Sequence, residues 1–147
     1  MLGIMYRTSS SNLKLQKIKM DKRTIIFVVD KKGNAGKSWF CQYWESVYSD
    51  SLYLTPGKRN DMIHAVYSAV RQFKTFFIDV ARSTQDTDGK VRIPYEFMEM
   101  LKNGIMTNHK YGCGNFRFPV PHVVVMTNQE PDPSMLSEDR MEIYRLD

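Results

Sequence analysis

The chain has 147 residues, of which 42% are hydrophobic and 25% are charged, so it is long enough for one domain with a real core. Its net charge of +5 favours an anionic partner such as nucleic acid or a nucleotide, although an excess of this size is also common on ordinary surfaces. Cys41 and Cys113 lie in no CxxC pair, which argues against a zinc site and a disulfide framework. No apolar run approaches the roughly 20 residues of a membrane span, so we expect no membrane partner.

The first part of the chain, residues 1–21, is rich in Ser and Lys with scattered apolar residues. We expect a poorly ordered leader or linker here, followed by a domain that spans residues 22–147. A short amphipathic helix is the alternative, because four apolar positions could share one face. These positions are Leu13, Leu15, Ile18 and Met20.

Residues 25–29, IIFVV, predict a buried strand that ends in a polar loop, and aromatic residues at helical spacing predict a helix at 38–49. Strand, loop and helix form the context in which the Gly-Lys-Ser triplet at 36–38 indicates a phosphate-binding loop. Glycine lets the backbone curl around an anion, and the helix start offers unpaired N–H groups and a positive dipole end. The expected nucleotide-binding residues are Gly33, Asn34, Ala35, Gly36, Lys37 and Ser38.

Two of these residues have distinct chemical roles, which make ATP and Mg²⁺ the expected cofactors. Lys37 would reach the terminal phosphates as a point charge, and Ser38 would place its hydroxyl on Mg²⁺. Lys31 stands where the strict GxxxxGK[ST] pattern has its first glycine. The alternative is a basic surface turn that happens to spell Gly-Lys-Ser.

The rest of the chain alternates between strand and helix patterns, which predicts a three-layer α/β domain with a mostly parallel sheet. Further strands are expected at residues 51–55, 75–80 and 122–127, and further helices at residues 61–73 and 94–103. Residues 105–121 are irregular and could contain a hairpin, and residues 137–139 could cap a turn before the final segment.

Polar residues occupy the ends of two predicted strands. Asp79 lies near the end of the strand at 75–80, and Asn128 directly follows the strand at 122–127. Because ligands of parallel sheets bind at the carboxyl ends of strands, we expect both to meet the phosphate loop there. Asp79 would hold Mg²⁺ directly or through water, and Asn128 would orient the attacking water or contact the γ-phosphate. An Asp that caps a turn and an Asn within a turn are the alternatives.

The words GNAGKS, FFIDVARS, KNGI with HKYG, VVVMTNQEP and LSEDR occur in an order that resembles the superfamily 3 helicase domain, an AAA+-like P-loop NTPase. The closest resemblance is to Rep replication initiator proteins of small circular single-stranded DNA viruses of the nanovirus and circovirus type. It implies that Gly33, Gly36, Lys37 and Ser38 form the Walker A loop, that Asp79 is the Walker B acid, and that Asn128 is the motif C sensor. Arg140 of SEDR resembles an arginine finger that reaches the neighbouring subunit of a homo-oligomeric ring, such as a hexamer.

The resemblance also implies that residues 102–117 form a loop that grips single-stranded nucleic acid inside the ring. Its expected contacts are Lys102, His109, Lys110 and Tyr111. Positive charge mixed with aromatic faces is typical of single-strand binders, although a solvated basic loop has a similar composition. Val80, not a second acid, follows Asp79, so the catalytic base is placed by position alone at Glu99, three residues before KNG.

Together these features predict an ATP-dependent helicase or ATPase that hydrolyses ATP with Mg²⁺ and moves along single-stranded DNA or RNA. Its location would be the host nucleus for a viral replication protein, and otherwise intracellular. An inactive or truncated module that binds nucleotide and nucleic acid without unwinding is the first alternative. A small-molecule kinase is the second, and it gives no role to Asn128 or Arg140.

Overall fold

A computed structural model describes most of the chain. The described residues are 2–7, 13–18, 23–32, 37–47, 50–69, 73–80, 92–112 and 114–145. Of the expected phosphate loop, Gly33, Asn34, Ala35 and Gly36 lie outside these residues. Among the described residues, no helix is long and apolar enough to cross a membrane.

A five-stranded parallel sheet lies at the centre, with the strand order β4-β5-β8-β3-β9. The strands are β3 (Ile25–Val29), β4 (Ser51–Leu54), β5 (Thr75–Val80), β8 (His122–Thr127) and β9 (Met141–Arg145). All residues of β3 and β5 are buried, as expected for parallel strands covered on both faces. The predicted strands are thereby confirmed, and the final segment adds β9 beside β3.

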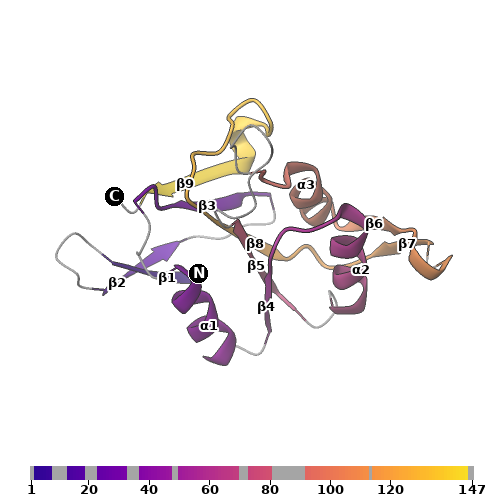
Figure 1. The fold of residues 1–147 in the computed structure, drawn as a ribbon, viewed down its shortest axis with the longest axis horizontal. Helices are drawn as coiled ribbons and strands as arrows, with labels where there is room; N and C mark the ends of the chain where they lie inside the picture. The colour runs from indigo at the N-terminus through magenta and orange to yellow at the C-terminus, as the bar shows by residue number, and fades with distance from the viewer. Residues whose placement is uncertain are drawn as a thin grey trace.

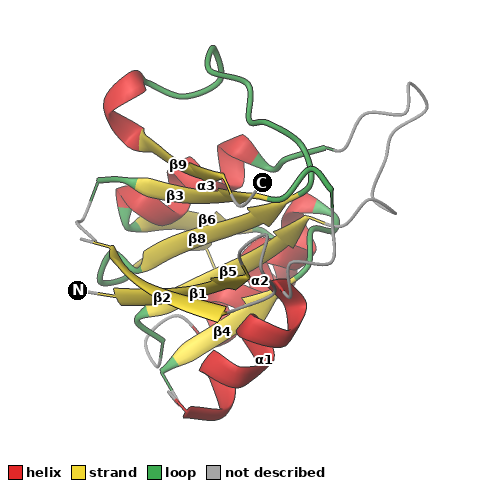
Figure 2. Cartoon of the chain, turned by 90° about the vertical axis from the view of Figure 1, so that its left-hand side faces the viewer, coloured by secondary structure: helices red, strands yellow, loops and turns green. Residues whose placement is uncertain are grey.

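Helices cover both faces of the sheet (Figure 2). On one face lies α1 (Lys37–Val47), whose Phe40 and Trp44 pack with side chains such as Val28. On the other lie α2 (Arg59–Ala69) and α3 (Tyr95–Asn103), which pack with Phe27 and its neighbours. Successive side chains of each strand therefore face different helices, and the α/β architecture with a parallel central sheet is confirmed.

A hairpin follows α3 and projects at one end of the molecule (Figure 1). It consists of β6 (Ile105–Asn108) and β7 (Gly114–Arg117), joined by a turn that includes the 3₁₀ helix η2 (Lys110–Gly112). The hairpin suggested for this stretch is thus confirmed. The chain then forms β8, a loop, the short 3₁₀ helix η3 (Glu138–Arg140) and β9.

The first residues of the chain form an antiparallel hairpin of β1 (Leu2–Arg7) and β2 (Leu13–Ile18) on the α1 side of the sheet (Figure 2). The alternative of a helix in this segment is wrong. Apolar and polar residues alternate with a period of two from Leu13 to Gln16, and that period suits a strand. The expected poorly ordered leader therefore contains two strands.

The predicted helix at residues 61–73 begins earlier, at Arg59, because the backbone N–H of Met62 donates to the carbonyl of Lys58. Ile63 and Val66 of this helix are buried, whereas Tyr67 is 42% exposed.

Replacement of Gly104 should destabilise the fold. Gly104 ends α3 with a φ of +75°, and an added Cβ would lie 3.1 Å from the carbonyl oxygen of Phe118. Left-handed backbone costs other residues roughly 1–2 kcal/mol, so Gly104→Ala should lower the free energy of unfolding by at least about that amount in urea titrations. Gly57→Ala is the control, because nothing lies within 4 Å of its Cβ position. Equal stability of the two variants would contradict this account.

Candidate functional site

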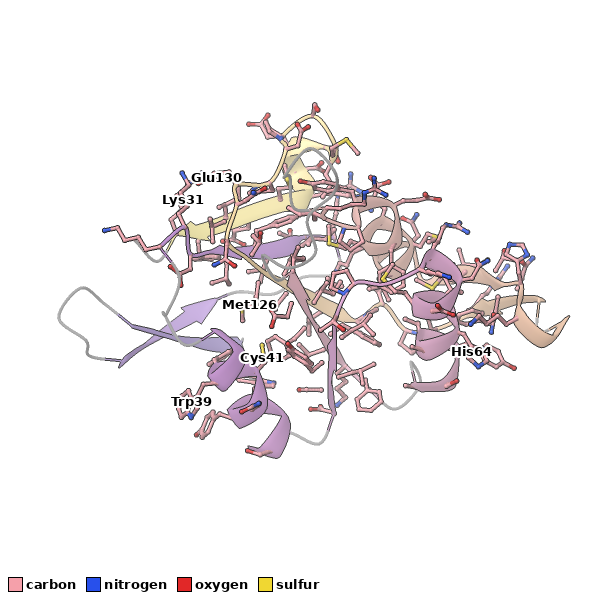
Figure 3. The ribbon with its side chains drawn as sticks, in the orientation of Figure 1. Lys31, Trp39, Cys41, His64, Met126 and Glu130 are labelled. Atoms are coloured by element: carbon pink, nitrogen blue, oxygen red, sulfur yellow. The ribbon has the colours of Figure 1, made fainter. Side chains whose placement is uncertain are left out.

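The register of three neighbouring strands decides where Asp79 lies. Met126 of β8 pairs with Asp79 of β5 on one side and with Val28 of β3 on the other, so the three residues form one row across the sheet. Val28 and Met126 pack in the cluster beneath α1, and Met126 is labelled in Figure 3. Because residues in one row share a face, Asp79 lies on the α1 side near the carboxyl edge.

Asp79 is held in place by a tyrosine of the edge strand. Its Oδ2 atom accepts a hydrogen bond of 2.5 Å from the hydroxyl of Tyr53 in β4, which packs against the same cluster. The residue is buried, with 9% of its surface exposed. A carboxylate oriented in this way at a strand end is the type of oxygen ligand that Mg²⁺ prefers.

Asn128 joins the ends of the two central strands. It follows Met126 by two residues, and its Nδ2 donates to the carbonyl of Asp30 at 2.8 Å. The N–H of Asp30 in turn donates to the carbonyl of Thr127 at 2.9 Å. Asn128 is therefore bound directly to the first residue beyond β3, where the expected phosphate loop begins.

Asp30 itself was not selected from the sequence. It is only 1% exposed. It follows Val28 by two residues, so it lies on the same side of the sheet as Val28 and nearer to the expected loop. The available signal was an acid placed directly after a buried apolar strand, which resembles the position of Asp79 near the end of its strand. The carboxyl edge thus carries two buried acids, Asp30 and Asp79, and the amide of Asn128.

Lys31, the departure from the glycine pattern, is part of an ion-pair network. Its Nζ lies 3.4 Å from Oε1 of Glu130, and both residues are labelled in Figure 3. Arg145 at the end of β9 donates two hydrogen bonds to the same carboxylate, from Nε to Oε1 at 2.6 Å and from Nη2 to Oε2 at 3.0 Å. Glu130 therefore links the segments that follow β3 and β8 to the last residue of β9. Sequence reasoning also missed Glu130.

The connection from β3 to α1 has the predicted strand, loop and helix order, since β3 ends at Val29 and α1 begins at Lys37. Because β3 and β4 are parallel, α1 must carry the chain back along the sheet, and its first turn starts at the carboxyl edge. The side chains of Lys37 and Ser38 lie outside what the structure describes, so their roles stay predictions.

Glu99 does not lie on the same side of the sheet as Asp79. It lies in the middle of α3, whose Phe97 and Leu101 pack on the sheet face opposite to α1. The sheet therefore separates Glu99 from Asp79, and we withdraw Glu99 as the catalytic base. Its position relative to KNG carried no information about which face the helix covers.

Arg140 lies at the other end of the sheet. It directly precedes β9, whose Met141 pairs with Ile25 at the start of β3, and its Nη2 donates to Oδ1 of Asn103 at 3.2 Å. The length of β3 thus separates Arg140 from the loop of its own chain. A role as arginine finger requires a second subunit and stays a prediction.

The expected nucleic-acid contacts differ in position. Lys102 is only 5% exposed, and its Nζ donates to the carbonyl of Pro121 at 2.9 Å, so it is a structural residue of α3 and we withdraw it as a contact. His109 is exposed at the hairpin turn, and Lys110 beside it forms an ion pair with Asp61. The side chain of Tyr111 lies outside what the structure describes.

Glu130 should contribute to stability in a pH-dependent way. The hydrogen bonds from Arg145 lower the pKa of Glu130 from its ordinary value of 4.5. Stability from this group is therefore present above about pH 4.5 and is lost as the pH falls through the lower folded-state pKa. Because the group is partly exposed, Glu130→Gln should cost below about 1 kcal/mol at pH 7, and the difference from wild type should shrink as the pH is lowered below about 4.5 in denaturant titrations.

No protein-family model matches the chain. It is 37% identical over 128 residues to Para-Rep C6 of Subterranean clover stunt C6 alphasatellite, a match covering 85% of this chain and 42% of the relative. It is 31% identical over 143 residues to Para-Rep C9 of Faba bean necrotic yellows C9 alphasatellite, covering 95% of this chain and 47% of the relative. The chain spans less than half the length of these relatives. Its homologues are thus Para-Rep proteins of alphasatellites, in agreement with the Rep resemblance of the motifs.

Proposed function

We propose that the chain is the ATP-hydrolysing part of a viral replication protein of the Rep type, and that it uses ATP to move along single-stranded DNA or RNA. One observation carries the proposal. The strand register and the Asn128–Asp30 hydrogen bond gather Asp79, Asp30 and Asn128 at the carboxyl edge of the sheet, where α1 begins. Two buried acids and an amide beside a helix start suit a nucleoside triphosphate with a divalent cation. The Para-Rep relatives support the replication part of the proposal.

In this proposal the triphosphate lies at the start of α1, where the backbone N–H groups and Lys37 balance its charge. Mg²⁺, held by Ser38 and Asp79, would neutralise charge that develops on the phosphate oxygens. The Tyr53 hydroxyl fixes the rotamer of Asp79. Asn128 is anchored by Nδ2 to the Asp30 carbonyl, and we assign its Oδ1 atom to orient the attacking water.

The position of Arg140 makes a second subunit part of the proposal. Because it lies at the amino end of the sheet, a head-to-tail neighbour could bring it to the phosphates at the carboxyl end. In a homo-oligomeric ring such as a hexamer, every subunit contacts the next one head to tail in this way. The exposed hairpin turn with His109 and Lys110 would then contact the nucleic-acid strand.

Loss of the loop lysine should abolish phosphate release. ATP hydrolysis by Lys37→Ala and by Asp79→Asn should fall at least about a hundredfold in a nucleic-acid-stimulated assay, because each change removes charge stabilisation at the transferring phosphate. Lys74→Ala is the matched control, since exposed Lys74 lies at the opposite end of β5. Hydrolysis that Lys37→Ala leaves unchanged would refute the enzyme hypothesis. Nucleotide binding by wild type without hydrolysis would favour the binding module.

Mixing two inactive variants should restore activity if Arg140 acts on a neighbour. Arg140→Ala and Lys37→Ala should each be inactive alone, because the first lacks the finger and the second lacks the phosphate lysine. In mixed rings, an intact loop can meet an intact Arg140 from the next subunit. We expect the rate of ATP hydrolysis to increase as one variant is added to the other, and to be greatest when the two variants are present in about equal amounts. Activity no higher than that of either variant alone would argue against a shared site.

A further inference from the structure

Three residues on one face of α2 contact the β6–β7 hairpin. The residues are spaced by three, which places them along one side of the helix: Asp61, His64 and Tyr67. Their partners on the hairpin are, in the same order, Lys110, Asn108 and Phe116. The hairpin is therefore positioned by α2 as well as by the end of α3 (Figure 1).

Two of the three contacts are buried or aromatic and anchor the hairpin. Asn108 is only 1% exposed; its Oδ1 accepts from the backbone N–H of Lys110, and its Nδ2 lies 3.1 Å from Nδ1 of His64. His64 is labelled on α2 in Figure 3. The ring of Tyr67 packs edge-on against Phe116, with centroids 5.1 Å apart. These contacts hold the turn in place independently of the third.

The third contact, Asp61 with Lys110, has a different character. It is an ion pair near the surface, with 55% of the Asp61 side chain and 35% of the Lys110 side chain exposed. The hydrogen bond from Lys110 lowers the pKa of Asp61, so the carboxylate is charged at neutral pH. An exposed pair of this type adds little stability, and a polyanion can compete for the cation.

We infer that Asp61 occupies the place of a nucleic-acid phosphate on Lys110, so that a strand binds the hairpin by displacing this carboxylate. The inference rests on the proposed function, because it requires that the hairpin contacts a strand. Chemical similarity supports it, since an ionised carboxylate and a phosphate oxygen make the same charge-assisted hydrogen bond to an ammonium group. The His64 and Tyr67 contacts keep the hairpin in position during the exchange. Asp61 thus sets the strength and the salt dependence of strand binding.

The test measures the dissociation constant of fluorescently labelled oligothymidine for the whole chain over a range of salt concentrations. Asp61→Asn should tighten binding about two- to fivefold, the factor that corresponds to an exposed ion pair. The plot of log affinity against log salt should become steeper by up to about 0.7, because the displaced Asp61 carboxylate, which offsets the charge of Lys110 beside the bound strand in the wild type, is absent from the variant. Lys110→Gln should weaken binding more in the Asp61→Asn background than in wild type.

Glu96→Gln is the matched control. It also removes one carboxylate charge and breaks an exposed ion pair, the one with Arg59, without a change in the hairpin contacts. A gain from net charge alone would be equal in the two variants and would persist when Lys110→Gln is added, and that result overturns the inference. If the wild type binds and Asp61→Asn changes neither the affinity nor the salt slope, the inference is also overturned, but the proposed function survives. Absence of binding by both proteins overturns the inference together with the nucleic-acid part of the proposed function.

Discussion

The parallel pairing of β3 with β8 and of β8 with β5 is the constraint on which the candidate site depends. A slip of one residue in either pairing would turn Asp79 or Asn128 to the face covered by α2 and α3. The same slip would remove Met126 and its row neighbours from the apolar cluster beneath α1. Burial of apolar side chains in the middle of the strands therefore fixes the register of the polar residues at their ends.

Strands β3, β4, β5 and β8, the helices, and the meeting of Asp79 with the end of β8 could be predicted from the sequence, because period and strand polarity contain that information. The face of the sheet on which Glu99 lies could not, since the position of a helix relative to a motif does not state which side it covers. Lys102 shows a related difficulty. A lysine near a conspicuous motif suggests a surface contact, but its ammonium group is buried on the Pro121 carbonyl.

The missing glycine at Lys31 has a tertiary explanation that no local pattern contains. Its side chain pairs with Glu130, which Arg145 of β9 also binds, and Lys31 is distant from both in the chain. The start of the expected phosphate loop is therefore restrained by its neighbours on both sides: by the Asn128 amide through the Asp30 carbonyl and by Glu130 through Lys31. These contacts restrain Asp30 and Lys31, the two residues that directly follow β3, before any ligand binds.

Strand β8 connects the two regions to which we assign function. One end carries Asn128 at the candidate nucleotide edge, and the other follows the hairpin through the Phe118–Pro121 segment. That segment is fixed at both ends, because Phe118 N–H donates to the Gly104 carbonyl and Lys102 binds the Pro121 carbonyl. Buried between β5 and β3, β8 cannot shift without its neighbours. In the proposed mechanism, hydrolysis would therefore move each hairpin together with its whole sheet, and the displacement would arise between subunits, where Arg140 meets the neighbouring phosphates.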